Sequence, residues 1–239
     1  MSLVTLLLEK EILFNMKLFI AGTDTEIGKT YISTGILQAF NQRGLSTLGC
    51  KPIATGCVWQ QNQLRNEDAV ALQRAASIKL PYHRINPFAF EPPIAPHIAA
   101  NQNQQLLSVQ TLNEKMDYAL NYPADVCLIE GVGGWYVPLN ERETMADFVI
   151  AQQLKVILVI GIRLGCINHS LLTFRAMQHD GVEVIGWVAN CIHPDMDYCY
   201  ENISTLQNWL PIPCLGKVGY KQFPEYEDEI FNQIKANAA

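Results

Sequence analysis

The chain has 239 residues, of which 49% are hydrophobic and 17% are charged, so it can bury a sizeable core and is not compositionally disordered. Its net charge of -6 and its pI near 5.4 argue against a protein that binds nucleic acid by neutralising many phosphates. We therefore expect a single domain over residues 16–239 and no nucleic acid partner.

The first 15 residues precede the first predicted strand and are expected to be an extension outside this domain. Their apolar run, Leu6-Leu7-Leu8, is followed by charged residues and lacks the basic start and the cleavage site of a signal peptide. No apolar run reaches the ~20 residues that span a membrane, so no membrane contact is expected.

The 7 cysteines are odd in number and scattered, which is typical of reduced thiols in a cytoplasmic protein. Cys191, His193 and Cys199 lie close together in the chain. This segment has no pair of cysteines with two residues between them and only one histidine, so a zinc site is less favoured than free thiols.

Short apolar runs separated by segments of helix length indicate buried parallel strands joined by crossover helices. Strands are predicted at residues 17–21, 47–51, 125–130, 156–161, 184–190 and 215–218. Helices are predicted at residues 29–42, 66–76, 112–120, 145–154, 169–178 and 197–209. Residues 81–110, rich in proline, asparagine and glutamine, are predicted to form an ordered loop. The alternation predicts an α/β fold with helices on both faces of a mostly parallel sheet, and ligands beyond the carboxyl ends of its strands.

A glycine-rich loop follows the first predicted strand: Gly22-Thr23-Asp24-Thr25-Glu26-Ile27-Gly28-Lys29-Thr30. Glycine lets backbone N–H groups approach phosphates, Lys29 can reach the terminal phosphates, and the Thr30 hydroxyl can bind magnesium. Five residues, rather than the usual four, separate the two glycines. The alternative is a glycine turn with a helix cap at Thr30. The strand before and the helix after favour a nucleotide site, and thus a three-layer P-loop NTPase fold.

Two other predicted strands end in charged residues. Glu130 ends one strand and is followed by Gly131-Val132-Gly133-Gly134-Trp135, so its carboxylate can hold magnesium, with the capping of a glycine turn as the alternative. Lys51 ends another strand, where it is either a second cation facing the phosphates or a solvated lysine.

Two polar residues are more ambiguous. Asp68 follows Asn66 at a predicted helix start, where an acid is favoured by the helix dipole alone, so the segment itself does not indicate a metal ligand. Asn190 ends the fifth predicted strand, and its amide can either pair with a purine base or close a turn. No Asn-Lys-x-Asp element follows any strand, which weakens the case for a GTPase.

Taken together, these segments resemble the dethiobiotin synthetase family of biotin biosynthesis, and the resemblance runs from about residue 17 to residue 216. The residues that carry it are Gly22 to Thr30, Lys51-Pro52-Ile53-Ala54-Thr55-Gly56, Arg65-Asn66-Glu67-Asp68-Ala69, Glu91 to His97, Glu130 to Trp135, Leu164-Gly165-Cys166-Ile167-Asn168-His169 and Gly186-Trp187-Val188-Ala189-Asn190. In this context the lengthened phosphate loop is support for the assignment.

The resemblance implies a ligase that consumes ATP and requires Mg²⁺. The implied ATP-binding residues are Glu26, Ile27, Gly28, Lys29, Thr30, Tyr31, Asp68, Glu130, Gly131, Val132, Gly133, Asn190 and Cys191. The implied metal ligands are Thr30, Asp68 and Glu130, and the implied catalytic residues are Lys29 and Lys51. The implied substrate-binding residues are Thr25, Lys51, Thr55 and, from the partner of a homodimer, Gly165, Cys166, Ile167 and Asn168.

The implied reaction begins when one amine of 7,8-diaminononanoate captures CO2, which is in equilibrium with bicarbonate, as a carbamate. A carbamate oxygen attacks the γ-phosphate of ATP, and the second amine then displaces phosphate from the mixed anhydride and closes the ring. No protein nucleophile is needed, so His97 and His169 are not expected to be general bases.

The chain departs from the family pattern at Cys191-Ile192-His193-Pro194 and at Val218-Gly219-Tyr220, which leaves the preference between ATP and CTP open. Two alternative functions would use the same phosphate loop. An amide-forming ATPase related to cobyrinate amidation normally adds a glutaminase domain, for which this chain has no room. A septum-positioning or partitioning ATPase usually carries a signature lysine where this chain has Asp24.

Overall fold

The computed structural model describes residues 15–222 together with residues 224, 231 and 234. The predicted extension, apart from Asn15, and most of the chain after residue 222 lie outside the described residues. No helix in the described part of the chain is long and apolar enough to cross a membrane.

A six-stranded sheet forms the centre of the molecule, in the order β10-β9-β8-β1-β7-β2, and all its neighbouring strands are parallel. Its strands are β1 (Met16–Gly22), β2 (Thr47–Cys50), β7 (Val126–Glu130), β8 (Lys155–Ile162), β9 (Val184–Cys191) and β10 (Cys214–Val218). The six predicted strands are confirmed to within one residue at each end. They were recognisable because strands buried on both faces are continuous apolar runs.

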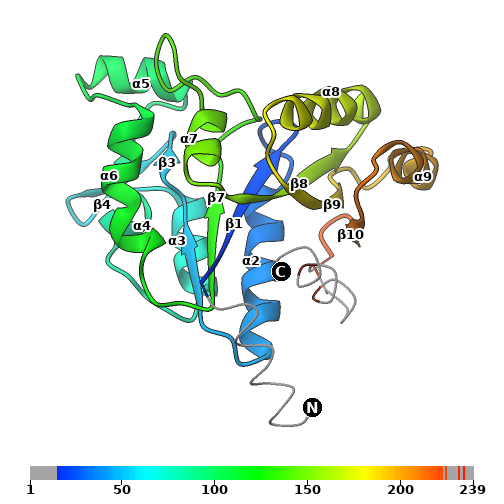
Figure 1. Cartoon of the computed structure of the whole chain (residues 1–239), viewed down its shortest axis with the longest axis horizontal. Helices are drawn as coiled ribbons and strands as arrows, with labels where there is room; N and C mark the ends of the chain where they lie inside the picture. Colours follow the sequence, from blue (N-terminus) through cyan, green and yellow to red (C-terminus); the bar gives the residue numbers. More distant parts are fainter. Residues whose placement is uncertain (1–14, 223, 225–230, 232–233, 235–239) are drawn as a thin grey trace.

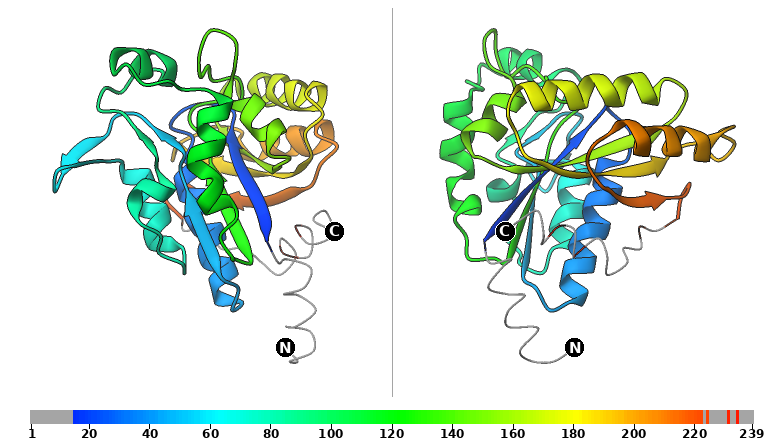
Figure 2. Two further views of the ribbon diagram at one scale, coloured as in Figure 1. Left: turned by 60° about the vertical axis from the view of Figure 1, so that its left-hand side comes forward. Right: turned by 45° about the vertical axis from the view of Figure 1, so that its right-hand side comes forward.

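Helices cover both faces of the sheet (Figures 1 and 2). One face packs against α2 (Lys29–Gln42) and the apolar side of α3 (Glu67–Ala75), through buried residues such as Ile36, Phe40 and Leu72. The other face packs against α6 (Val109–Leu120), α7 (Met145–Ala151), α8 (Cys166–His179) and α9 (Cys199–Trp209). The two apolar clusters on opposite faces hold the sheet between the helical layers and confirm the predicted three-layer α/β fold.

Helix boundaries differ from the predictions where capping decides them. Helix α6 begins at Val109, three residues before the predicted start, because Ser108 and Thr111 form a capping box. Helix α8 begins at Cys166, three residues early, after Gly165 adopts a left-handed conformation with φ 90°. The predicted end of α7 at residue 154 is wrong, because the helix stops at Ala151.

The prediction of a loop over residues 81–110 is also wrong in part. This stretch contains α4 (Tyr82–Ile85), β6 (Phe88–Ala89) and α5 (Pro96–Gln102). Proline does not prevent a helix at Pro96, because it occupies the first helical position, where its missing N–H has no partner to lose.

Four short strands, β6 among them, were not predicted. Strand β3 (Ile53–Ala54) pairs with β6, and β4 (Val58–Gln60) forms a hairpin with β5 (Gln63–Arg65). The hairpin turns through two left-handed residues, Gln61 and Asn62. Strands of two or three residues show no usable periodicity, so only the folded chain reveals them.

Candidate active site

The loop between β1 and α2 folds tightly over the carboxyl end of the sheet. Gly28 adopts a left-handed conformation with φ 83°, and a Cβ atom there would lie 2.2 Å from the Asn190 amide nitrogen. That amide donates a hydrogen bond of 2.8 Å to the Ile27 carbonyl. Glycine is therefore required where β9 supports the loop, and the positive N-terminal end of α2 lies directly beside it.

Lys29, the first residue of α2, extends back across this loop. Its ammonium donates to the Asp24 carbonyl at 2.7 Å and to the Gly133 carbonyl at 2.8 Å. Burial, followed by the positive charge of Lys51, lowers the pKa of Lys29 from 10.5 to about 8. A lysine held this way is well suited to an anionic ligand, which would supply the charge that the free site lacks.

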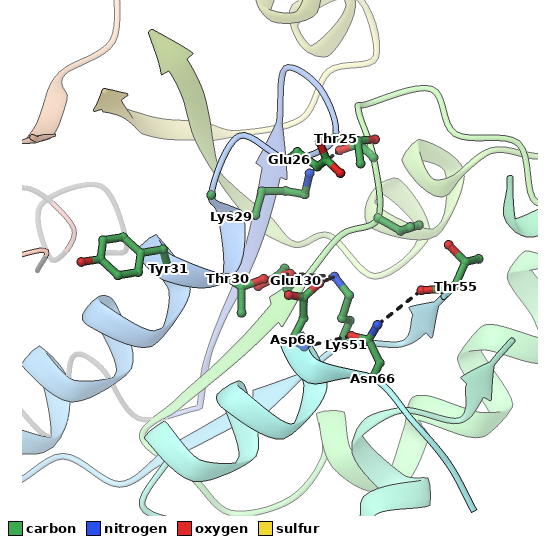
Figure 3. Close-up of a pocket in the computed structure, with 13 residues that line it drawn as sticks. Thr25, Glu26, Lys29, Thr30, Tyr31, Lys51, Thr55, Asn66, Asp68 and Glu130 are labelled. Carbon is green, nitrogen blue, oxygen red and sulfur yellow. Dashed lines mark hydrogen bonds and ion pairs between the residues drawn. The ribbon is translucent and has the colours of Figure 1, made fainter. Parts of the chain in front are cut away.

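Lys51 lies at the centre of a compact polar cluster (Figure 3). Its Nζ atom is 2.7 Å from Glu130 Oε1, 3.3 Å from Asp68 Oδ2 and 3.3 Å from the Gly131 carbonyl. The Thr30 hydroxyl donates to the same Glu130 oxygen at 2.8 Å. Burial lowers the pKa of Lys51, but the charges of Glu130 and Asp68 outweigh this effect and raise that pKa above its ordinary value.

The two lysines thus differ although they serve one site. Lys51 is paired with carboxylates and stays charged, whereas Lys29 contacts only carbonyl oxygens through the hydrogen bonds described above. Glu130 is 1% exposed, and its Oε2 atom has no hydrogen-bond partner among the described residues. A buried carboxylate oxygen without a partner is costly and is available to a cation.

These groups face a cavity of about 440 Å³ at the carboxyl ends of β1, β2 and β7. The cavity is lined by Thr25, Glu26, Gly28, Lys29, Thr30, Tyr31, Lys51, Thr55, Asn66, Asp68, Glu130, Val132 and Gly133. Most of the predicted phosphate, metal and substrate residues therefore come together in one place.

Other predicted residues lie outside this cavity. Ile27 is 1% exposed and packs over Gly161, and Gly131 rests against the ring of Phe19. The N-terminal turn of α8, residues 165–168, does not line the cavity in this single chain.

Asn190 and Cys191 end β9 on the far side of the phosphate loop. Cys191 lines a second cavity, of about 260 Å³, with residues that include Cys199, Lys217 and Tyr220. Its sulfur is 3.0 Å from the Cys199 sulfur. Among the described residues, no group of three His, Cys, Asp or Glu side chains is arranged to hold a metal ion.

Two residues near the site had not been singled out for it. Asn66 caps α3 by accepting from the Asp68 and Ala69 N–H groups, and its amide donates to the Thr55 carbonyl at 3.3 Å. Its position before an acidic helix start predicted the cap but not the link to Thr55. Asp24 forms an ion pair with Arg163, a contact across 139 residues that no local pattern indicates.

The parallel sheet and the lysine-bearing loop before α2 define a P-loop nucleotide-binding protein. Two solved structures share this fold. The septum site-determining protein MinD of Pyrococcus horikoshii, complexed with Mg-ADP, matches with a TM-score of 0.53 and 13% identity over 85% of this chain and 81% of that chain. The MinC:MinD complex of Aquifex aeolicus matches with a TM-score of 0.53 and 12% identity over 93% and 86% of the two chains.

Relatives of much higher identity define the family. A family model described as an AAA domain matches residues 16–223. The chain is 50% identical to the ATP-dependent dethiobiotin synthetase BioD of Cellvibrio japonicus, over 84% of this chain and 87% of that protein. It is 48% identical to the protein of the same name from Pseudomonas aeruginosa, over 84% and 88%. The chain belongs to the dethiobiotin synthetase family.

Proposed function

We propose that this chain closes the ureido ring of dethiobiotin from 7,8-diaminononanoate and CO2, at the expense of ATP. Family membership supports this activity. The observation that carries it is the convergence of Lys29, Lys51 and Glu130 on one cavity beside a phosphate-binding helix start. Two cations and a buried carboxylate around a site for phosphates suit the transfer of a phosphoryl group.

The two lysines take different roles in this proposal. Lys29 has three N–H donors, of which two contact the carbonyls of Asp24 and Gly133, and it offers the third to the transferring phosphoryl group. Lys51 is held in place by Glu130 and faces the carbamate. Both cations stabilise negative charge that develops between the carbamate oxygen and the phosphorus, so both are proposed as catalytic residues.

Mg²⁺ fits the residues that surround Glu130. The unpartnered Glu130 Oε2 atom, the Thr30 hydroxyl and the half-exposed Asp68 carboxylate would hold the ion together with water and phosphate oxygens. When bound, magnesium neutralises charge on the phosphates of ATP. In this proposal the protein supplies oxygen ligands to the ion, and no histidine or cysteine takes part.

The chemistry requires that the protein position the reacting groups, and it needs no protein nucleophile. One substrate amine adds to CO2 and loses a proton, which gives a carbamate. A carbamate oxygen bonds to the γ-phosphorus as ADP leaves, and the second amine then bonds to the carbonyl carbon as phosphate leaves. The buried lysines hold the anions in place and exclude water, which would hydrolyse the mixed anhydride.

We assign Asn190 and Cys191, two of the ATP-binding residues outside the main cavity, to the far side of the phosphate loop. Asn190 and Cys191 lie beside the second cavity, where a nucleotide base reached from the phosphate loop would bind. Residues 131–133 would contact the phosphates, and Tyr31 in Figure 3 extends from α2 away from the lysine cluster. Competition between ATP and CTP in a binding assay tests the base preference.

We further propose that the active protein is a homodimer. Thr25 and Thr55 line the cavity on the side proposed for the diamine substrate, and the α8 turn at residues 165–168 is proposed to bind the substrate carboxylate of the partner. Beside that turn, Leu164 is 95% exposed and Leu172 is 62% exposed, which supports a subunit contact. Sedimentation equilibrium of the wild type and of Leu172→Glu tests it; a monomeric wild type would contradict it.

Free thiols support a cytoplasmic location. None of the described cysteines forms a disulfide, and Cys50, Cys57, Cys127 and Cys166 are buried. Reduced buried thiols are the rule in a reducing compartment. Fractionation of cells that express the protein tests this location.

The decisive experiment traces the oxygen atoms of bicarbonate into the products. Purified protein is incubated with ATP, Mg²⁺, 7,8-diaminononanoate and ¹⁸O-labelled bicarbonate, and the products are analysed by mass spectrometry. The mechanism requires dethiobiotin and one ¹⁸O atom in the released phosphate, because the attacking carbamate oxygen leaves with phosphorus. ATP turnover that ignores the diamine but responds to membranes or DNA would instead indicate a septum-positioning or partitioning switch.

A further inference from the structure

A carboxylate at the end of α8 holds the loop that follows β7. Asp180 Oδ2 accepts a hydrogen bond of 2.7 Å from the Trp135 indole N–H, and Asp180 Oδ1 accepts one of 2.9 Å from the Tyr136 hydroxyl. The two aromatic residues are neighbours in the chain, and each uses a different carboxylate oxygen. The arrangement fixes their backbone from one side.

The position of Asp180 is not explained by its own helix. Asp180 is the C-terminal cap residue of α8, and its backbone N–H donates to the Ala176 carbonyl. The carbonyl groups at this end of a helix make a negative charge unfavourable. The two hydrogen bonds to the aromatic residues offset that repulsion, which points to a role outside α8.

The opposite side of the same loop rests on β1. The Gly131 N–H donates to the Ile20 carbonyl at 3.0 Å. The ring of Trp135, which is 5% exposed, packs edge-on against Phe19 with a centroid distance of 6.5 Å. The loop is thus held at its start by β1 and at its end by α8.

Between these two anchors lies the Gly133 carbonyl, which accepts a hydrogen bond from Lys29. The Asp24 carbonyl holds the same ammonium from the phosphate loop. Movement of Gly133 would leave Lys29 held on one side only. The residue bound by Asp180, Trp135, and the residue bound by Lys29, Gly133, are thus two positions apart on the same loop and are connected through its backbone.

We propose that Asp180 is a positioning residue that, through Trp135 and Tyr136, fixes the Gly133 carbonyl and thereby aims Lys29 at the transferring phosphoryl group. The effect on turnover rests on the proposed function, whereas the effect on the loop does not. Mispositioning of a charged group lowers the rate of the chemical step more than it weakens substrate binding.

The test compares Asp180→Ala with Asp180→Asn. Alanine removes both hydrogen bonds. Asparagine retains them, because its carbonyl accepts from Trp135 and its amide donates to the Tyr136 hydroxyl oxygen. We expect kcat to fall about tenfold in D180A, with the KM for ATP within about twofold, and to return to within about twofold of the wild type in D180N. An equally impaired D180N would show that charge, not position, matters and would overturn the proposal.

A double-mutant cycle separates this role from general stability. Tyr136→Phe removes only the hydroxyl and is expected to lower kcat about threefold in the wild type but not in D180A, because the interaction is already lost there. Tyr118→Phe, on the surface of α6, serves as the matched control and is expected to be silent. Lower melting temperatures with unchanged kcat per folded molecule would assign Asp180 a purely structural role and refute the proposal.

Hydrogen exchange of the free protein tests, without any turnover, whether Asp180 holds the loop of residues 131–136; we call this contact the clamp. D180A is expected to accelerate the exchange of amides in residues 131–136 by about tenfold or more, and D180N is expected to leave it near the wild-type rate. Unchanged exchange in D180A would overturn the clamp. If D180A and D180N show these exchange rates but the wild-type protein forms no dethiobiotin, the proposed function is refuted and the role of Asp180 in holding the loop stands.

Discussion

The two halves of the carboxyl edge of the sheet differ in charge. Beyond β1, β7 and β2, the side chains of Lys29, Lys51 and Glu130 converge on one cavity. Beyond β9, the thiol of Cys191 faces Cys199, and burial followed by its hydrogen bond to Cys199 raises the pKa of Cys191 to about 12. That thiol stays neutral at neutral pH. Two lysines and a buried carboxylate therefore meet at the site proposed for the phosphates, whereas the cavity proposed for the base contains thiols and the single lysine Lys217.

The largest expected effect comes from Lys29. Lys29→Ala should lower kcat by about 10²–10³-fold, the range found when one preorganised donor to a developing anion is lost. The fold should persist, because burial of this ammonium opposes its charged form. Steady-state phosphate release measures the loss. Lys155→Ala, at the other end of the sheet, is the control, and a K29A rate near wild type would remove Lys29 from the mechanism.

Lys51 should affect both activity and stability. Lys51→Met should lower kcat by about 10- to 100-fold and destabilise the fold by about 3 kcal/mol, because it leaves the 1% exposed Glu130 without its charged partner. The double variant K51M/E130Q should recover stability but not activity. Turnover and urea denaturation measure the two effects. If the double variant recovers activity as well as stability, Lys51 and Glu130 have only a structural role.

The pH dependence tests how the two lysines differ. Because burial and Lys51 lower the pKa of Lys29 to about 8, the free protein loses that charge as the pH rises above 8. The kcat/KM for ATP reports the free protein and should fall about tenfold per pH unit above this value. Lys51→Met removes the repelling charge, so the decline should move to higher pH. A profile in K51M that begins to decline at the same pH as the wild type would argue against this coupling.

The smallest effect is expected at the edge of the sheet beyond β9. Asn190→Ala removes the hydrogen bond to the Ile27 carbonyl, and a typical net value of about 1 kcal/mol predicts a rise in the KM for ATP of about fivefold. Since no charge is lost, kcat should change by less than about twofold. Initial rates over a range of ATP concentrations check this. A large fall in kcat with an unchanged KM would instead assign Asn190 to the chemical step together with Lys29 and Lys51.

The sequence by itself determined the elements and the residue types at their ends. Continuous apolar runs predicted the six strands, because buried parallel strands need no polar face. Gly28, Lys29 and Thr30 indicated an anion site because that chemistry depends on a local turn into a helix. Glu130 and Lys51 were recognisable as candidates because parallel strands present their carboxyl ends at one edge.

Only the tertiary structure decided which candidates meet. The ion pair of Lys51 with Glu130 joins residues 79 positions apart, and the hydrogen bond of Trp135 to Asp180 joins residues 45 apart. Such contacts depend on the order of strands in the sheet and on where each helix crosses it. Hydrophobic periodicity and capping act over one or two turns of chain, so they predict each element but not its neighbours.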